Sequence, residues 1–487
     1  MHSTRLSAIF ATLVAIAALA LPAWAQTYTW INDTPGTQSW HVAANWSPAA
    51  VPPAGADVII PAGTNTVQIS TADVTVNSLS VNRPLSISSS RSLTPGTMTV
   101  ASTVTMGSTT TLQNGTIDMA GGTLAFSSGT TCVTAARLSN LAINGDITFA
   151  TAVNVRWNSV TLAGTMTFTT GTSYLRYEGN QTITGHIVNN SPNNLYPISA
   201  LTGTLTVAEG AIVEGGNVYF EQGSSGCSGP SQVALLVNNG TISGSASRPT
   251  SVSPTTQFGP NAAISGTVQF NTVLDLQGGT WTHASGTIYL QGGATLQNGT
   301  INMAGGSLRL SSGSLCSVAA TLLNLTIDGD VALQPGVNSR WNNVILNGSM
   351  TLTGTGNNYI WFVGDQTLTG HIINATSGYW LYLQSSSGGT LVVENSASIE
   401  GGNIVLGQET NLACSGNGQF SLINNGTISG GSGPTYVKSP TFFGPTASIL
   451  GTVQFDNTLD LQGGAWTHAG GTIYLQGGAT LQNGTIN

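Results

Sequence analysis

A long internal repeat constrains this chain more than any other feature of its sequence. The last seventeen residues, GTIYLQGGATLQNGTIN at 471–487, occur unchanged at 286–302. The segment STVTMGSTTTLQNGTID at 102–118 aligns with both, and matching segments fill each interval of about 185 residues. A chain that repeats so much of itself must fold into equivalent units rather than into one irregular core.

The repeat predicts the domain organisation. We expect a first long repeat at 102–285, a second at 286–470, and the start of a third at 471–487. Residues 26–101 precede them as an N-terminal cap with the first coils. The sequence is therefore expected to be the front of a longer array, a fragment that stops inside its third unit.

A unit of this length is too long for one turn of a solenoid, so a finer period is expected within it. Short apolar strands recur roughly every 18 to 30 residues, separated by Asn-Gly, Gly-Gly and Ser-Gly turns. Coils of this size are typical of a parallel β-helix, whereas a string of β-sandwiches is the competing architecture. Dense turns, scarce charge and the lack of linkers favour an all-β, elongated right-handed parallel β-helix.

The N-terminal segment, residues 1–25, is expected to be a signal peptide. A basic start is followed by an apolar, alanine-rich stretch that ends in Ala-Trp-Ala, the small residues that a signal peptidase requires. We expect cleavage near Ala25 and Gln26 and a mature protein that is secreted or held at the cell surface. No later segment is expected to span a membrane.

Charged side chains are scarce. They make up 6 % of the 487 residues, with ten Lys and Arg against eighteen Asp and Glu. This balance argues against a basic surface that binds nucleic acid or an anionic membrane. Because 40 % of the residues are hydrophobic, the chain has ample apolar area for a core. The solvent-facing surface must then consist largely of hydroxyl, amide and backbone groups.

The segment after the signal peptide differs from the repeats. It contains Trp30, Trp40 and Trp46, followed by two prolines and the strand-like sequence DVII. The order T-x-T-W, N-W-S-P, D-V-x-I resembles the opening of large secreted bacterial β-helix proteins, including adhesin-like and haemagglutinin-like surface proteins. The resemblance covers about 50 residues and implies an architecture, not a ligand. We expect the aromatic residues to cover the unpaired edge of the first coil.

Charged residues that occur in both long repeats are the first candidates for chemistry. Asp146 and Arg156 correspond to Asp330 and Arg340, and each pair could form a polar patch. A structural role is the favoured interpretation, since an Asp beside a turn can bond backbone groups and an Arg can cover a coil edge. No two acids recur at a spacing that suggests a general acid and base. We therefore predict no catalytic residue.

Four aromatic residues are candidates for stacking on sugar rings, namely Tyr289, Tyr379, Trp380 and Tyr382. Packing in the core or at a coil edge is the alternative. Ice binding by a flat threonine ladder is disfavoured, because the Thr-x-Thr motif drifts from one coil to the next.

The histidines give no predicted metal or cofactor site. His186 and His371 form one equivalent pair and His283 and His468 another, but each is distant in sequence from other ligand-type residues. No cofactor is expected.

The four cysteines, Cys132, Cys227, Cys316 and Cys414, come two to a repeat. Export would permit disulfides. However, about four coils of roughly 4.8 Å each separate Cys132 from Cys227, and a disulfide requires Cα atoms within about 7 Å. We therefore expect unpaired, buried thiols.

These observations predict a non-catalytic exported repeat protein that forms an adhesin-like β-helical stalk. Its partners would be extracellular glycans or the surface of a host or neighbouring cell, without nucleic acid. The alternative is an extracellular β-helix protein that binds or degrades polysaccharide. An acid and base on adjacent coils, or a cleft lined by aromatic rings, would favour that alternative.

Overall fold

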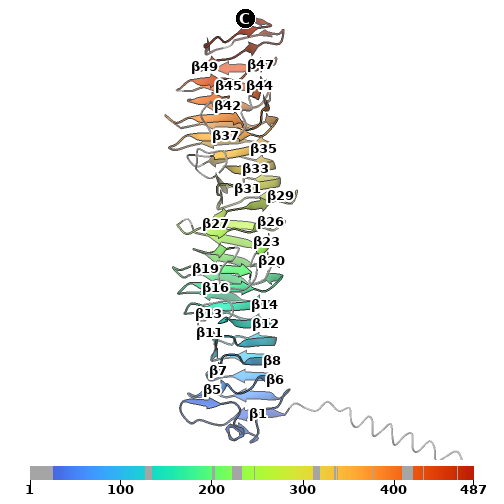
Figure 1. Cartoon of the computed structure of the whole chain (residues 1–487), viewed down its shortest axis with the longest axis vertical. Helices are drawn as coiled ribbons and strands as arrows, with labels where there is room; N and C mark the ends of the chain where they lie inside the picture. Colours follow the sequence, from blue (N-terminus) through green and yellow to red (C-terminus); the bar gives the residue numbers. More distant parts are fainter. Residues whose placement is uncertain are drawn as a thin grey trace, which may run out of the picture. The chain divides into compact units, whose positions relative to one another are not determined.

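The computed structural model consists almost entirely of β-structure. Strands make up 59 % of it, and parallel strands stack into a β-solenoid of about 18 turns (Figure 1). The predicted all-β parallel β-helix is confirmed. The signal segment and all four cysteines lie outside the described residues. The described residues are 26–126, 134–199, 203–221, 233–245, 247–310, 319–333, 336, 338–376, 378–407, 420–431, 433–468 and 470–487.

Two compact units make up the fold. Of the described residues, the first contains those up to Ala125 together with Asn140–Asn144, and the second contains those within Phe126–Ser139 and Gly145–Asn487. In the first unit the strands follow the orders β3-β1-β4-β6-β8-β10 and β2-β5-β7-β9. Their bounds are β1 (Thr27–Trp30), β2 (Thr37–Ser39), β3 (Trp46–Ser47), β4 (Asp57–Ile60), β5 (Thr66–Ile69), β6 (Val74–Val81), β7 (Leu85–Ile87), β8 (Ser92–Val100), β9 (Thr103–Met106) and β10 (Thr111–Asp118), with a short 3-10 helix at Ala43–Asn45.

Tryptophans close the first coil. Strand β3 pairs antiparallel with β1, joining Thr29 to Ser47 and Trp30 to Trp46, so the outer edge of β1 has a partner. The Trp46 ring lies edge-on to Trp30 and Trp40, with centroids 5.0 and 4.7 Å apart, and all three side chains are buried. This cluster covers the end of the coil stack with packed aromatic rings.

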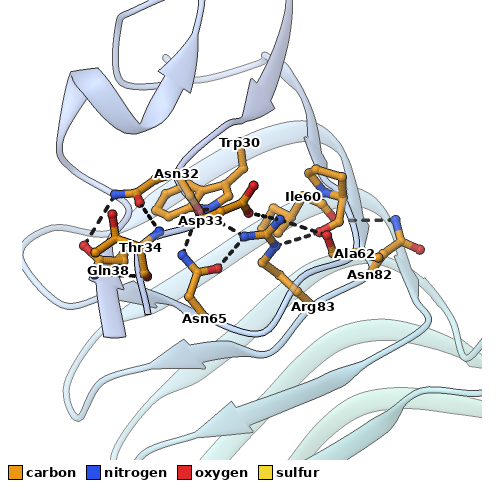
Figure 2. Close-up of polar contacts among 11 residues, drawn as sticks. Trp30, Asn32, Asp33, Thr34, Gln38, Ile60, Ala62, Asn65, Asn82 and Arg83 are labelled. Atoms are coloured by element: carbon orange, nitrogen blue, oxygen red, sulfur yellow. Dashed lines mark hydrogen bonds and ion pairs between the residues drawn. The ribbon is translucent and has the colours of Figure 1, made fainter. Parts of the chain in front are cut away.

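A buried arginine fastens this cap to the coils that follow. The Arg83 side chain is 2 % exposed and lies among oxygen atoms from the cap and from the turn after β4 (Figure 2). Its guanidinium forms an ion pair with Asp33 at 2.9 Å. Its other acceptors are the carbonyls of Asn32, Pro61 and Ala62 and the side chain of Asn65. A Cβ at Gly63 would lie 2.3 Å from the guanidinium carbon, so a larger residue there would shift the guanidinium.

In the second unit each long repeat places its strands at three positions of the coil, which we call faces 1, 2 and 3. The names follow equivalent sequence positions in the two repeats; in the stack itself, the face 3 strands of the first repeat continue in one sheet into the face 1 strands of the second. We define face 1 by β12, β14, β16, β19 and β22 in the first long repeat and by β33, β35, β37, β40, β43, β46, β49 and β52 in the second. In Figure 1 the labels β33, β35 and β37 follow one another coil by coil. The bounds are β12 (Ala136–Asn144, of which Ala136–Ser139 belongs to this unit), β14 (Asn154–Ala163), β16 (Ser173–Tyr177), β19 (Leu195–Ser199), β22 (Tyr219–Phe220), β33 (Ala320–Asp328), β35 (Asn338–Asn347), β37 (Asn358–Phe362), β40 (Leu381–Ser385), β43 (Ile404–Leu406), β46 (Thr435–Val437), β49 (Thr452–Phe455) and β52 (Thr472–Leu475).

The remaining strands complete the coils. Face 2 contains β13 (Ile147–Phe149), β15 (Thr165–Phe168), β18 (His186–Asn189), β21 (Ile212–Gly215), β24 (Thr241–Gly244) and β27 (Ala263–Phe270), then β34 (Val331–Leu333), β36 (Ser349–Leu352), β39 (His371–Asn374), β42 (Ser398–Gly401), β45 (Thr427–Gly430) and β48 (Ser448–Leu450). Face 3 contains β17 (Gln181–Ile183), β20 (Gly203–Val207), β23 (Val233–Asn238), β26 (Thr255–Phe258), β28 (Val273–Asp275) and β31 (Thr295–Asn302), then β38 (Gln366–Leu368), β41 (Gly389–Val393), β44 (Phe420–Asn424), β47 (Thr441–Phe443), β50 (Leu459–Asp460) and β53 (Leu481–Gln482). Further strands are β11 (Thr123–Phe126), β25 (Thr250–Val252), β29 (Thr280–Thr282), β30 (Thr287–Leu290), β32 (Ser307–Leu310), β51 (Ala465–Trp466) and β54 (Thr485–Ile486).

A column of asparagines forms a corner within the long strands. Asn298, Asn324 and Asn343 lie inside β31, β33 and β35 with φ of 57°, 48° and 54°, in the left-handed region that Asn tolerates better than most residues. Asn324 donates its side-chain N–H to Asn298 at 3.5 Å, and Asn343 donates to Asn324 at 3.1 Å. The column therefore bends each coil and bonds it to the coil before.

Candidate functional site

The aspartates that occur in both repeats hold neighbouring coils together. Asp146 accepts the backbone N–H of Thr165 at 2.8 Å, and Asp330 accepts that of Ser349 at 2.9 Å. Each bond fixes the first residue of the next face 2 strand, β15 or β36. Among the described residues, no ion pair joins either aspartate to the arginine that the sequence placed beside it.

Arg156 belongs instead to an ion cluster that the sequence analysis missed. The Glu178 carboxylate, 3 % exposed, accepts from Arg137 at 2.8 Å through one oxygen and from Arg156 through the other. The two arginine side chains are 35 % and 34 % exposed. Arg176 lies opposite Arg156 in the next coil, donates to Asn154 at 2.7 Å, and is buried, which lowers its pKa. Three arginines thus occupy adjacent strands of face 1.

The second long repeat retains only Arg340 from this group. Thr321, Trp361 and Val363 stand where the first repeat has its other charged side chains. The Nε atom of Arg340 is buried and has no hydrogen-bond partner among the described residues. Three of the four charged positions of the first repeat are therefore uncharged in the second.

Tyrosines stack beside the arginines of the first repeat. The rings of Tyr174 and Tyr196 lie 5.0 Å apart at 12°, and those of Tyr196 and Tyr219 lie 5.4 Å apart at 27°. The Arg176 guanidinium lies 4.8 Å from the centroid of the Tyr174 ring. Burial raises the pKa of Tyr196 above the ordinary value for a phenol. Because the ring faces cover one another, edges and hydroxyls remain for contact with a ligand.

The second repeat carries an aromatic groove at the equivalent strands of its own face 1. The Trp380 ring, just before β40, lies 6.3 Å from that of Tyr382 and 5.7 Å from that of Tyr436. Val405 is in register between the two tyrosines and forms a buried floor. The groove has a volume of 260 Å³. Its lining also includes Lys438 and Asp456.

This groove depends on two departures from the first repeat. Val405 replaces Tyr219, so the tyrosine stack stops at Tyr382 and leaves a gap over the following coil. Tyr436 replaces Ser251 and closes the gap from the other side. Aromatic rings beside polar and charged groups suit a sugar, which has apolar C–H faces and a rim of hydroxyls.

Of the four aromatic residues proposed as sugar-stacking candidates, two therefore line the groove and two do not. Trp380 and Tyr382 come together in the groove, whose lining does not include Tyr379 or Tyr289. Tyr379 is exposed, and Tyr289 lies on β30 with the Arg309 guanidinium 4.6 Å from its ring centroid.

The histidines make local contacts. His186 lies 3.0 Å from Glu214, while His371 lies 2.7 Å from Ser398. In the part of the chain that the structure describes, no three His, Cys, Asp or Glu side chains gather into a group that could hold a metal ion.

A second hollow recurs in both long repeats. It measures 340 Å³ in the first and 310 Å³ in the second. Gln277 and Gln462 lie at its rim with φ of 56° and 54°, and their backbone N–H groups donate to Asp275 and Asp460, both at 2.8 Å. The shared lining is Phe258, Leu276 and Trp281 in the first repeat and Phe443, Leu461 and Trp466 in the second. This hollow belongs to the common scaffold.

Sequence analysis missed Arg137, Glu178 and Tyr436 because it searched for residues present in both repeats. All three are replaced in the other copy. A comparison of the repeats for outward positions at which they differ would have found each of them.

Comparison with protein-family models, with curated proteins and with solved structures finds no match to this chain. The fold and the surface residues assign the chain to the class of parallel β-helix repeat proteins. Its two long repeats have the same pattern of coils and differ in the side chains exposed on face 1. Within the described residues, no helix has the length and apolar character to cross a bilayer.

Proposed function

We propose that this chain is a non-catalytic exported protein that forms an adhesin-like β-solenoid stalk outside the cell. The observation that carries the proposal is the use of the recurring carboxylates as fixed acceptors between coils, as in Asp146 and Asp330. A carboxylate engaged in this way is a structural group and is not placed as an acid or base. Duplication of such a scaffold extends the molecule and multiplies its surface.

A second function, binding of a neutral polysaccharide, is favoured by the groove of the second repeat. Three aromatic rings converge there from the coils of β40 and β46. A ring of a sugar chain that enters the groove would contact Trp380 through its C–H face and reach the polar lining with its hydroxyls. The stalk would then carry a glycan-binding site.

A glycan-array screen of the mature chain tests both functions. We expect binding to neutral glycans without release of reducing or unsaturated sugar ends. Trp380→Ala should weaken this binding at least tenfold, whereas Tyr379→Ala, one residue away and outside the lining, should not. Release of sugar ends would overturn the non-catalytic proposal, and equal binding by both variants would overturn the assignment of the groove.

A further inference from the structure

The first long repeat concentrates positive charge on a chain that has little of it. The whole sequence contains ten Lys and Arg residues, and three of them, Arg137, Arg156 and Arg176, lie on the adjacent strands β12, β14 and β16. Glu178 is the carboxylate bonded within this group, so the four side chains carry a net charge of two positive units. Glu221 is the next acid in the same register column, two coils beyond Arg176.

The buried carboxylate orients the two outer arginines. Arg137 and Arg156 each use Nε and Nη2 to bind Glu178. Their Nη1 atoms have no hydrogen-bond partner among the described residues, and about a third of each side chain is exposed. Adjacent coils are roughly 4.8 Å apart, so the two groups can donate to one anion or to neighbouring anions on one chain. Because Glu178 holds them in place, little side-chain entropy is lost on binding.

The tyrosine stack adds a second feature of a carbohydrate site. Tyr174 and Arg176 are two residues apart on one strand and share its outer face, as the cation–π contact of 4.8 Å confirms. The stack continues through Tyr196 and Tyr219 in the direction in which the coils stack. The guanidinium column on β12, β14 and β16 thus adjoins the phenol column on β16, β19 and β22, and the two columns meet at β16.

We propose that face 1 of the first long repeat binds an anionic polysaccharide whose carboxylates contact Arg137 and Arg156. Its sugar rings would lie against the edges and hydroxyls of the tyrosine stack. The ligand must be extended, since both columns continue over several coils, and it must carry repeated negative charges to match the arginines. A polyuronate has both properties. The choice of a polysaccharide rests on the proposed extracellular role, whereas the cationic site is a feature of the structure independent of the groove in the second repeat.

Polygalacturonate and its fully methyl-esterified form provide a matched pair of probes, because they share a backbone and differ in charge. Binding of the mature chain to each is measured by calorimetry at low and high salt. The test variant is R137Q/E178Q/R156Q, which replaces Glu178 and the two arginines bonded to it by neutral amides, so that Glu178 does not remain as a carboxylate without its partners. R340Q, at the equivalent position in the second repeat, is the control, and W380A monitors the groove.

We expect polygalacturonate to bind and its ester not to bind, with affinity falling as salt is raised. The triple variant should bind at least tenfold more weakly, while R340Q and W380A bind as the unaltered chain does. Equal binding of both polymers, no binding of polygalacturonate, or an equal loss in R340Q would overturn the inference. If the triple variant melts at a lower temperature, its weaker binding is set aside. The inference is then judged by the salt dependence of binding and by the comparison of the polymer with its ester, both measured on the unaltered chain. Loss of neutral-glycan binding in W380A alone bears on the groove and not on this site.

Discussion

Face 1 of the first long repeat and face 1 of the second consist of equivalent strands but differ in their outward side chains. In the first repeat, Arg137 and Arg156 surround Glu178, and the tyrosine stack continues through Tyr219. In the second, the buried carboxylate is replaced by Val363 and the stack is interrupted. The scaffold therefore tolerates both a charged and an aromatic surface. Side chains retained between the copies build the coil, and those that differ determine what it can contact.

The largest expected effect is on stability, and it follows from replacing Glu178 of the first repeat by valine, the residue at the equivalent position 363 of the second. Glu178→Val removes the carboxylate that Arg137 and Arg156 share, while the arginines can partly rehydrate. We expect unfolding free energy to fall by about 1–3 kcal/mol, measured by chemical denaturation. Val363→Gln, which adds no charge at the equivalent position, is the control. An unchanged stability would show that the cluster is not a structural element.

A change in the opposite direction should close the groove. Val405→Tyr restores the residue of the first repeat at the floor, where it would fill the gap between Tyr382 and Tyr436. We expect affinity for a neutral glycan to fall at least tenfold, about 1.4 kcal/mol, in a binding titration. Tyr219→Val in the first repeat should leave this affinity unchanged. Retained affinity in the Val405 variant would place the binding site elsewhere.

Where the repeats agree, equal changes should have equal effects. Asp146→Ala and Asp330→Ala each remove one acceptor of a backbone N–H group from the next coil. We expect each to lower the unfolding free energy by about 0.5–1.5 kcal/mol, as judged by denaturant titration. A clear difference between the two variants would contradict the view that these positions belong to a common scaffold.

The smallest effect concerns pH. His283 is 0 % exposed, and burial lowers its pKa below the ordinary value of 6.5. Below pH 6.5 the unfolded chain binds more protons than the folded one, so stability is full above that pH and decreases as pH falls toward the lowered pKa. The melting temperature should fall between pH 7 and pH 5, and His283→Gln should reduce that dependence. His468→Gln, at the half-buried equivalent position, is the comparison. If it reduced the pH dependence of the melting temperature equally, burial of His283 would not be the cause of that dependence.

Much of the fold could be predicted because its causes are local and repeated. The turns, the short apolar strands and the period of about 185 residues all point to stacked coils. The roles of Asp146 and Asp330 were also accessible, since an acid beside a turn commonly bonds a backbone N–H.

The sites were only partly accessible from the sequence. Trp380 and Tyr382 are close in the chain and could be proposed together, but Tyr436 reaches them only through the register of β40, β43 and β46. Likewise, Arg137 lies 41 residues from Glu178 and meets it because consecutive coils stack. Such contacts depend on coil lengths, which vary in this chain.

The bonds that the repeated aspartates and the asparagine column make between coils run in one direction. Thr165 donates back to Asp146, and Asn343 donates back to Asn324, so the acceptor lies in the earlier coil and the donor in the later one. These acceptors in one coil have no donor until the next coil has folded against it. In a chain that emerges N-terminus first, these acceptors are therefore in place before the coil that donates to them is made.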